Sequence, residues 1–224
     1  MLSAERTTRL QPFQYHTRTT KPALDISVRE MAAENGEHIE HIWIITGPAG
    51  CGKTTVAQHL AKELSLPYVE GDDFHSAANK QKMASGNPLT DADRWDWLIT
   101  LRNEAIKQLQ HSNGVIVTCS ALKHKYRDVI RVANYEHPSV QVHFVYLKVD
   151  ETTLQKRVAA RVGHYMKEGM VHSQMATLEE PELDEEWDVL PVDVREDKEA
   201  VKKNAVEVVQ RKLKEYEGQP RHLN

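Results

Sequence analysis

The stretch from residue 47 to residue 54 has the residue types and the spacing of a phosphate-binding loop. Its sequence is Gly-Pro-Ala-Gly-Cys-Gly-Lys-Thr; it follows the apolar run IWIIT and leads into a helical pattern. A triphosphate is bound by converging backbone N–H groups, and glycines permit the positive φ that this requires. The helix N-terminus adds its dipole, Lys53 adds a charge for the β- and γ-phosphates, and Thr54 is the expected Mg²⁺ ligand. The pattern predicts binding of ATP or GTP with Mg²⁺.

We expect the nucleotide contacts to come from this loop, the first helical turn after it and one arginine further along the chain. These residues are Gly47, Ala49, Gly50, Cys51, Gly52, Lys53, Thr54, Thr55 and Arg157. Two interpretations of Cys51 are open. Its thiol is either reactive, with a pKa lowered by the helix N-terminus, or a small filler beside a useful backbone N–H group.

A second set of reactive side chains follows the next apolar segment. Residues 70–75 are Glu-Gly-Asp-Asp-Phe-His, at the expected carboxyl edge of the sheet, where open α/β folds bind their ligands. A carboxylate there can accept the proton of an attacking hydroxyl or hold water around Mg²⁺. Asp72 is the main candidate. The alternative is that Asp72 and Asp73 only cap a helix beginning near Phe74.

These motifs must be positioned by short apolar runs that alternate with amphipathic helices. The pattern predicts strands over 42–46, 67–70, 115–119, 140–147 and 189–194, and helices over 53–65, 91–111, 123–132, 151–161 and 197–216. Such alternation is typical of βαβ units around a buried parallel sheet. Three stretches do not fit this pattern, 75–88, 163–171 and 179–188, and we expect loops there, the last one solvated and acidic.

Composition excludes several classes of protein. No run approaches the roughly 18 apolar residues of a membrane-spanning helix, and the 224-residue chain has 29 basic against 33 acidic residues, a net charge of −4. Without a basic excess, a dedicated nucleic-acid binder is disfavoured. Two cysteines form no disulfide framework, which favours a cytoplasmic protein. We expect residues 1–40 to be a polar, flexible extension, with a targeting peptide as the alternative, before one domain over 41–218.

Three segments resemble the gluconate kinase family. They are GPAGCGKTT, then GDDFHSAANKQKMASGNPLTDADRWDWL over 71–98, then CSALKHKYRDVIR over 119–131. The resemblance extends from about residue 42 to the C-terminal helix. It implies an α/β, three-layer P-loop kinase fold similar to adenylate and shikimate kinases, with a five-stranded parallel sheet flanked by helices and a mobile lid. It also implies ATP-dependent phosphorylation of the 6-hydroxyl of D-gluconate, feeding the pentose phosphate pathway, by a homodimer.

The resemblance further assigns roles to individual residues. The catalytic residues it implies are Lys53, Asp72 and Arg161, with Asp72 as general base or as orienter of the 6-hydroxyl. The substrate-binding residues it implies are Asp72, His75, Lys82, Arg94, Ser120, Lys123, Arg127, His164 and Gln174. Gluconate carries a carboxylate and several hydroxyls, so its pocket needs a cation and hydrogen-bonding groups. Arg94 is the first choice for the carboxylate, because a guanidinium pairs with it through two hydrogen bonds.

For several of these residues a structural interpretation is also open. His75 is alternatively a satisfied structural histidine, Lys82 a residue on a solvated helix face, and Arg127 a member of an ion pair on its helix. Arg157 and Arg161 are four residues apart, just before a stretch that adenylate-kinase-like folds use as a lid, here expected over about 161–178. Their charges would neutralise the transferred phosphoryl group, unless they are merely surface arginines.

The chain also departs from the family pattern, and two rival functions are open. Met175 and Ala176 stand where the family usually has Phe-Glu, which puts the role of an acid there in doubt. A kinase of another small metabolite, such as shikimate, is disfavoured because the chain has no Gly-Gly-Gly substrate loop. A non-catalytic, nucleotide-gated binding module is the other rival, and it would tolerate Asp72→Asn.

Overall fold

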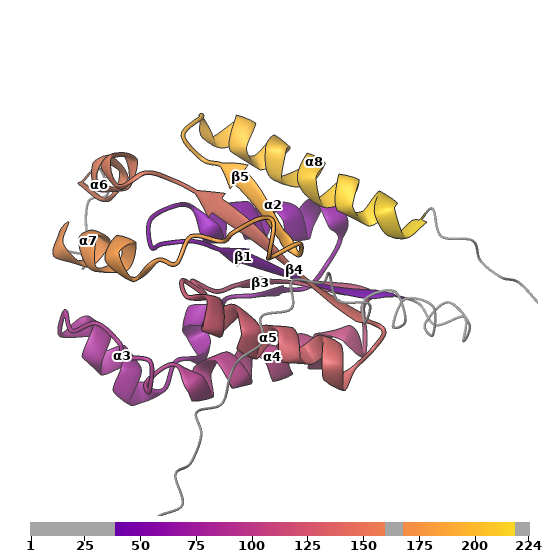
Figure 1. Ribbon diagram of the computed structural model, residues 1–224, viewed down its shortest axis with the longest axis horizontal. Helices are drawn as coiled ribbons and strands as arrows, with labels where there is room; N and C mark the ends of the chain where they lie inside the picture. Colours follow the sequence, from indigo (N-terminus) through magenta and orange to yellow (C-terminus); the bar gives the residue numbers. More distant parts are fainter. Residues whose placement is uncertain (1–38, 160–167, 218–224) are drawn as a thin grey trace, which may run out of the picture.

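The centre of the molecule is a parallel five-stranded sheet with the strand order β2-β3-β1-β4-β5 (Figure 1). The computed structural model describes residues 39–159 and 168–217. The strands are β1 (Glu40–Thr46), β2 (Tyr68–Val69), β3 (Gly114–Thr118), β4 (Val140–Lys148) and β5 (Val189–Asp193). All five were predicted from the apolar runs. Because β1 pairs in parallel with both β3 and β4, with Ile44 opposite Val117 and Phe144, their carboxyl ends meet at one edge.

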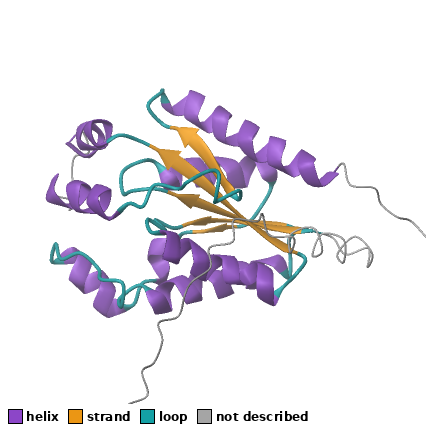
Figure 2. Cartoon of the chain, in the orientation of Figure 1, coloured by secondary structure: helices purple, strands orange, loops and turns teal. Residues whose placement is uncertain are grey.

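Helices cover both faces of the sheet, which makes three layers (Figure 2). On β1, Ile42 and Ile44 join the core beneath α4 (Trp95–Leu109) and α5 (His124–Glu136). Trp43 and Ile45 point the other way, into the core beneath α2 (Lys53–Leu64) and α8 (Lys198–Glu217). Side chains of a strand alternate between the two faces, so a strand buried on both sides is apolar throughout. The three-layer α/β fold predicted from the sequence is therefore confirmed.

Short helices gather at the carboxyl edge of the sheet, as Figure 1 shows: α3 (Ala77–Ala84), α6 (Glu151–Ala159) and α7 (Glu168–Thr177). The 3₁₀-helix η1 (Gly71–Phe74) follows directly after β2. This edge is where parallel α/β sheets place their ligands. Across residues 39–159 and 168–217, no helix has the length and apolar character needed to cross a membrane.

Helix α3 lies where we predicted a loop. Its sequence, AANKQKMA, has no apolar stripe, so the hydrophobic pattern gave no signal. The helix is instead fixed by polar contacts: the Ser76 side chain accepts a hydrogen bond from the backbone N–H of Asn79, an N-cap. The buried Asn79 in turn donates from Nδ2 to the carbonyl of Asp93 at 2.6 Å.

Helix α4 begins at Trp95 and not at Asp91 as predicted. The preceding residues form a turn, in which Asp93 accepts hydrogen bonds at 2.7 Å from both the backbone N–H and the hydroxyl of Thr90. Such local bonds compete with helix formation. The turn leaves Asp91, Asp93 and Arg94 outside the helix, at the carboxyl edge of the sheet.

The lid region differs from expectation in part. Residues 168–171, predicted as loop, begin helix α7. Arg161, His164 and almost all of the extension expected over 1–40 lie outside the described residues.

Candidate active site

The phosphate-binding loop joins β1 to α2 and is shaped by its glycines. Gly47, Gly50 and Gly52 have φ of 138°, 88° and 111°, in the region that favours glycine. A Cβ on Gly47 would lie 3.0 Å from the sulfur of Cys51 and 3.1 Å from the carbonyl oxygen of Leu147. The loop thus has the glycine-dependent backbone of an anion-binding nest at a helix N-terminus, and it fits the phosphates of a nucleotide.

Two of the predicted cations lie against this loop. Lys53 Nζ donates to the carbonyl oxygens of Gly47 at 3.0 Å and Pro48 at 3.1 Å. From α6, the Arg157 guanidinium donates to the carbonyl of Cys51 at 3.2 Å and to that of Val194. Both charges are therefore held where phosphates would bind.

Cys51 is buried in the loop, 2 % exposed. Burial raises the pKa of its thiol above the usual value. A protonated thiol is a poor nucleophile, so the structure favours the small-filler interpretation over the reactive one.

Three further predicted residues flank the loop. Gln174, on α7, accepts a hydrogen bond through Oε1 from the backbone N–H of Ala49 at 2.6 Å, which places it at the nucleotide loop although we expected it at the substrate. The Ser120 carbonyl accepts from the Thr46 hydroxyl at 2.7 Å and from the Gly47 N–H at 3.4 Å, tying the ends of β1 and β3 together. Thr55 is exposed in the first turn of α2.

The Thr54 hydroxyl faces a carboxylate that we had not included among the site residues. It donates to Oε2 of Glu70 at 3.0 Å. Partial burial alone would raise the pKa of Glu70, but hydrogen bonds from Thr118, Tyr68 and Thr54 outweigh it and hold the pKa below its usual value. Mg²⁺ prefers oxygen ligands, and a hydroxyl oxygen beside an ionised carboxylate fits this preference.

Asp72 is positioned by the two peptide groups that flank Gly71. The Gly71 N–H donates to the Thr118 hydroxyl at 2.9 Å, and its carbonyl accepts from Trp97 Nε1 at 2.8 Å. A Cβ on Gly71 would lie 2.0 Å from the Thr118 carbonyl oxygen, so only glycine fits this close approach of η1 to β3. Hydrogen bonds therefore hold both peptide groups that flank Gly71, the residue directly before Asp72.

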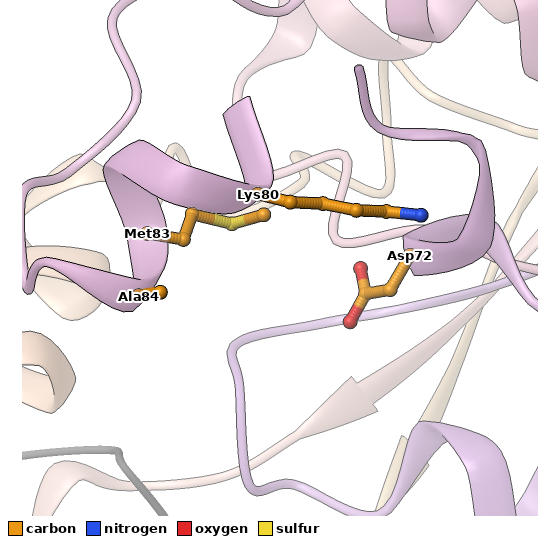
Figure 3. A pocket seen from close by; sticks show the side chains of 4 residues that line it. All are labelled: Asp72, Lys80, Met83 and Ala84. Atoms are coloured by element: carbon orange, nitrogen blue, oxygen red, sulfur yellow. The ribbon is translucent and has the colours of Figure 1, made fainter. Parts of the chain in front are cut away.

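The Asp72 carboxylate opens onto a cavity of about 190 Å³ between η1 and α3 (Figure 3). The cavity is lined by Asp72, Lys80, Met83 and Ala84. The side chain is 81 % exposed, so an acceptor can reach the carboxylate. The pKa of Asp72 is raised above its usual value, with desolvation as the first cause. The charge of Glu70 adds to this rise, whereas Lys53 and Arg94 oppose it. A carboxyl with a raised pKa is a better proton acceptor than an ordinary aspartate.

His75 forms a neutral wall next to Asp72. It is 6 % exposed, stacks on Trp97 with ring centroids 4.2 Å apart, and has Nε2 3.9 Å from Asp72 Oδ1. Burial, assisted by the charges of Arg94 and Lys80, lowers the pKa of His75 to about 4. Its buried Nδ1 has no hydrogen-bond partner in the described part of the chain, so the side chain is not the satisfied structural histidine of the alternative interpretation.

Two of the predicted substrate cations are already paired with acids. Lys82 lies 2.6 Å from Asp93, and Lys123 lies 2.9 Å from Asp91, which also accepts hydrogen bonds from Lys125 and Tyr126. These hydrogen bonds hold the pKa values of Asp91 and Asp93 well below their usual range.

Arg94 differs from these lysines. Its guanidinium lies 5.7 Å from the centre of the Tyr126 ring, and among residues 39–159 and 168–217 it has no carboxylate within ion-pair distance. Its buried Nε also has no hydrogen-bond partner there. Arg94 is thus the predicted cation most open to an anionic substrate.

The expectation that Arg127 binds substrate does not fit the structure. Arg127 is 1 % exposed and forms two hydrogen bonds of 2.6 Å with Glu186, while a third nitrogen donates to the carbonyl of Ala121 at 3.2 Å. Arg127 does form an ion pair, but not on its own helix as the alternative expected, because its partner Glu186 lies 59 residues away. The prediction of a fully solvated acidic loop is wrong for the same reason, because Glu186 and Asp188 are buried against Arg127 and Arg131.

Comparisons with known proteins place this fold and site in a family. A family model described as an AAA domain matches residues 42–181. A probable gluconokinase of Schizosaccharomyces pombe is 41 % identical over 178 residues, covering 79 % of this chain and 91 % of the relative. The thermoresistant gluconokinase of Escherichia coli K12 is 41 % identical over 182 residues, covering 81 % of this chain and 99 % of the relative.

A solved structure agrees with these sequence matches. The crystal structure of a gluconokinase from Sinorhizobium meliloti 1021 is 30 % identical, has a TM-score of 0.68, and matches over 81 % of this chain and 99 % of its own. Together with the phosphate-binding loop and the parallel sheet, these matches define a P-loop kinase, an enzyme whose family uses a nucleotide as phosphoryl donor. More narrowly, the chain belongs to the gluconokinase family.

Proposed function

We propose that this protein transfers the γ-phosphoryl group of ATP to the 6-hydroxyl of D-gluconate, giving 6-phospho-D-gluconate and ADP, with Mg²⁺ as the metal cofactor. The observation that carries the proposal is the environment of Asp72. Its carboxylate opens onto a cavity and is acted on by the charges of both Lys53, from the phosphate loop, and Arg94, from the acceptor side. A proton acceptor that is influenced both by a cation of the phosphate loop and by the cation proposed for the substrate carboxylate suits phosphoryl transfer to a hydroxyl of a sugar acid.

The reaction needs one proton transfer and one displacement at phosphorus. The proton of the 6-hydroxyl passes to the Asp72 carboxylate as the hydroxyl oxygen forms its bond to the γ-phosphorus. The bond from that phosphorus to the β,γ-bridging oxygen breaks, and ADP leaves. The raised pKa of Asp72 favours its acceptance of this proton.

The phosphate side is held by the loop and its cations. In this proposal the backbone of residues 47–54 binds the phosphates, and Lys53 and Arg157 stabilise the charge of the transferred group. Arg161, outside the described residues, is proposed to join them. Thr54 would hold Mg²⁺, which would supply positive charge between the β- and γ-phosphates.

The acceptor side is proposed to bind gluconate through Arg94, which has no ion-pair partner in the described part of the chain, and through several hydrogen-bonding groups. Arg94 would pair with the carboxylate. The unpartnered Nδ1 of His75 and the ammonium groups of Lys82 and Lys123, held in place by their acids, are proposed partners for the hydroxyls. The roles proposed for Ser120 and His164 rest on the family resemblance, and Gln174 would act from the nucleotide side.

A coupled assay of ADP release over a panel of acceptors tests this function. We expect D-gluconate to be turned over faster than other sugar acids, shikimate or nucleoside monophosphates. NMR of the product should show phosphorus at the 6-oxygen. Equal or greater turnover with shikimate or a nucleoside monophosphate would refute the proposal.

The family resemblance also supports a homodimer and a cytoplasmic location. Light scattering after size-exclusion chromatography of the full chain tests the first. Imaging of the full chain beside a variant lacking residues 1–38 tests the second, and the proposal predicts the same cytoplasmic distribution for both.

A further inference from the structure

Three hydroxyl groups from different parts of the chain converge on the carboxylate of Glu70. Tyr68, on the edge strand β2, and Thr54, at the start of α2, both donate to Oε2. Thr118, at the end of β3, donates to Oε1 and accepts a hydrogen bond of 2.9 Å from the Gly71 N–H. Glu70 thus links the phosphate loop to two neighbouring strands.

The direction of these hydrogen bonds follows from the chemistry of the groups. An ionised carboxylate only accepts, so each hydroxyl gives its one proton to Glu70. The Thr54 oxygen then has no proton left to donate, and its lone pairs remain available. A hydroxyl held in this way presents acceptor electrons to a cation and not a hydrogen atom.

The same contacts limit what Glu70 itself can do. A carboxylate has roughly four lone-pair sites, and Tyr68, Thr54 and Thr118 occupy three of them. Direct coordination of a metal by Glu70, or proton abstraction from an acceptor, would have to use the one remaining site or displace a hydroxyl. Glu70 is therefore suited to act through Thr54, whereas Asp72 is left to face the acceptor.

We propose that Tyr68 is a positioning residue for the metal: its hydroxyl, with that of Thr118, fixes the Glu70 carboxylate so that Glu70 takes the Thr54 proton and leaves the Thr54 oxygen to the divalent cation. The inference rests on the proposed function, since it assumes that Mg²⁺ binds at Thr54. Tyr68 lies two residues before Glu70 on an edge strand of only two residues. So short a strand has few backbone hydrogen bonds to fix the residues that follow it. The hydrogen bond from the Tyr68 hydroxyl therefore helps to fix the Glu70 carboxylate.

Tyr68→Phe is the sharpest test, because it removes one oxygen and keeps the ring. We expect the Mg²⁺ concentration for half-maximal activity to rise about tenfold, as loss of an outer partner of a metal ligand typically causes. At saturating Mg²⁺, kcat should return close to that of the wild type. Tyr135→Phe is the matched control, because Tyr135 is 75 % exposed on α5, and it should leave the Mg²⁺ dependence unchanged.

Calorimetry of nucleotide binding gives a readout that does not depend on turnover. ADP is titrated into the protein with EDTA and, separately, with Mg²⁺. Tyr68→Phe should reduce the gain in affinity that Mg²⁺ gives and leave the affinity in EDTA unchanged. Glu70→Gln, which cannot accept all three hydroxyl protons, should reduce the gain further.

The outcomes separate this inference from the proposed function. An unchanged Mg²⁺ gain in Tyr68→Phe overturns it, whatever Glu70→Gln does. An equal loss of ADP affinity with and without Mg²⁺ also overturns it, because that would indicate a purely structural role. If gluconate is not the acceptor but the Mg²⁺ gain falls as expected, the proposed function fails and the role of Tyr68 stands. A variant that unfolds is replaced by Thr118→Val, which removes a different hydroxyl from the same carboxylate and must give the same pattern.

Discussion

In the nucleotide half of the site, contiguous residues 47–54 supply the phosphate cradle from backbone geometry, whereas the acceptor half is assembled from side chains of η1, α3, the turn before α4 and the end of β3. The cations of the two halves are also held differently. Lys53 donates hydrogen bonds to carbonyl oxygens of its own loop, whereas Lys82 and Lys123 form ion pairs with Asp93 and Asp91. Local sequence is therefore enough to build the first half, and only the tertiary fold builds the second.

The largest effect is expected from a residue that belongs to neither half. Arg127→Met would leave Glu186 buried without its main partner, which typically costs about 3–5 kcal/mol. Urea denaturation should show this loss in the free energy of unfolding, with both KM values unchanged for the folded enzyme. Lys203→Met, in an exposed pair with Glu207, is the control and should cost ~1 kcal/mol or less.

If Arg127→Met instead raises the KM for gluconate and leaves the free energy of unfolding unchanged, Arg127 takes part in substrate binding. If Arg127→Met does not fold, Glu186→Gln removes the same charge pair from the other side.

The next largest effect should come from Asp72→Asn. Without a proton acceptor we expect kcat to fall about 10²-fold or more, with little change in ATP affinity measured by calorimetry. Asp73→Asn, on the neighbouring exposed residue, is the control and should keep most of the activity. A retained rate in Asp72→Asn would refute the base and indicate that Asp72 only holds water around Mg²⁺ or supports the structure.

The pH profile provides a second measurement on Asp72. The base works only when deprotonated, so activity should fall as the pH falls through the pKa of Asp72, which is raised above that of an ordinary aspartate. Asp72→Asn should have no such acidic limb.

A smaller effect is expected on the pH dependence of stability, through the buried and neutral His75 of the acceptor half. Because the pKa of His75 is about 4 in the folded protein, against about 6.5 unfolded, the unfolded state takes up a proton first as the pH falls. The stability that depends on neutral His75 is complete above pH 6.5 and is lost towards pH 4. Linkage predicts a loss of ~2 kcal/mol from pH 7 to pH 5.

His75→Phe keeps a ring against Trp97 and should remove this part of the pH dependence. Denaturation at the two pH values measures it, with His111→Gln, at an exposed residue, as the control. Equal pH dependence in His75→Phe and wild type would contradict a neutral, buried His75.

The smallest expected effect is on substrate affinity alone. Arg94→Gln should raise the KM for gluconate about tenfold, the worth of a hydrogen bond to a charged group, and leave the KM for ATP unchanged. Arg102→Gln, on α4 and paired with Glu136, is the control. If Arg94→Gln raises the KM for gluconate and the KM for ATP equally, Arg94 does not act on the acceptor side alone.

The contrast between the halves also explains what could be predicted from the sequence. The strands and the phosphate loop were predictable, because apolar runs and glycine spacing are local signals. Helix α3 was not, since its stability comes from the Ser76 cap and from Asn79 reaching Asp93, which no hydrophobic periodicity reveals.

Two contacts that the sequence did not reveal join residues that are distant in the chain. Thr118 meets Glu70 across 48 residues, and Arg127 meets Glu186 across 59. Glu70 was visible as a carboxylate at a strand end, with Tyr68 two residues before it, but the approach of Thr54 and Thr118 appears only once β2, β3 and α2 are side by side. Of the lid arginines, Arg157 lies at the loop, and the proposal for Arg161 still rests on the family resemblance.

The cavity beside Asp72 has a consequence for how such an enzyme can change its acceptor. Four residues line the cavity, and three of them, Lys80, Met83 and Ala84, lie on α3. This eight-residue helix lies outside the central sheet. Met83 is half-buried and Ala84 is exposed, so both can be exchanged at little cost to the folded state. Asp72, the proposed proton acceptor, instead follows Gly71, where any side chain would collide with β3. If Asp72 has this role, evolution or engineering can change the shape of the cavity while the position of the Asp72 carboxylate is kept.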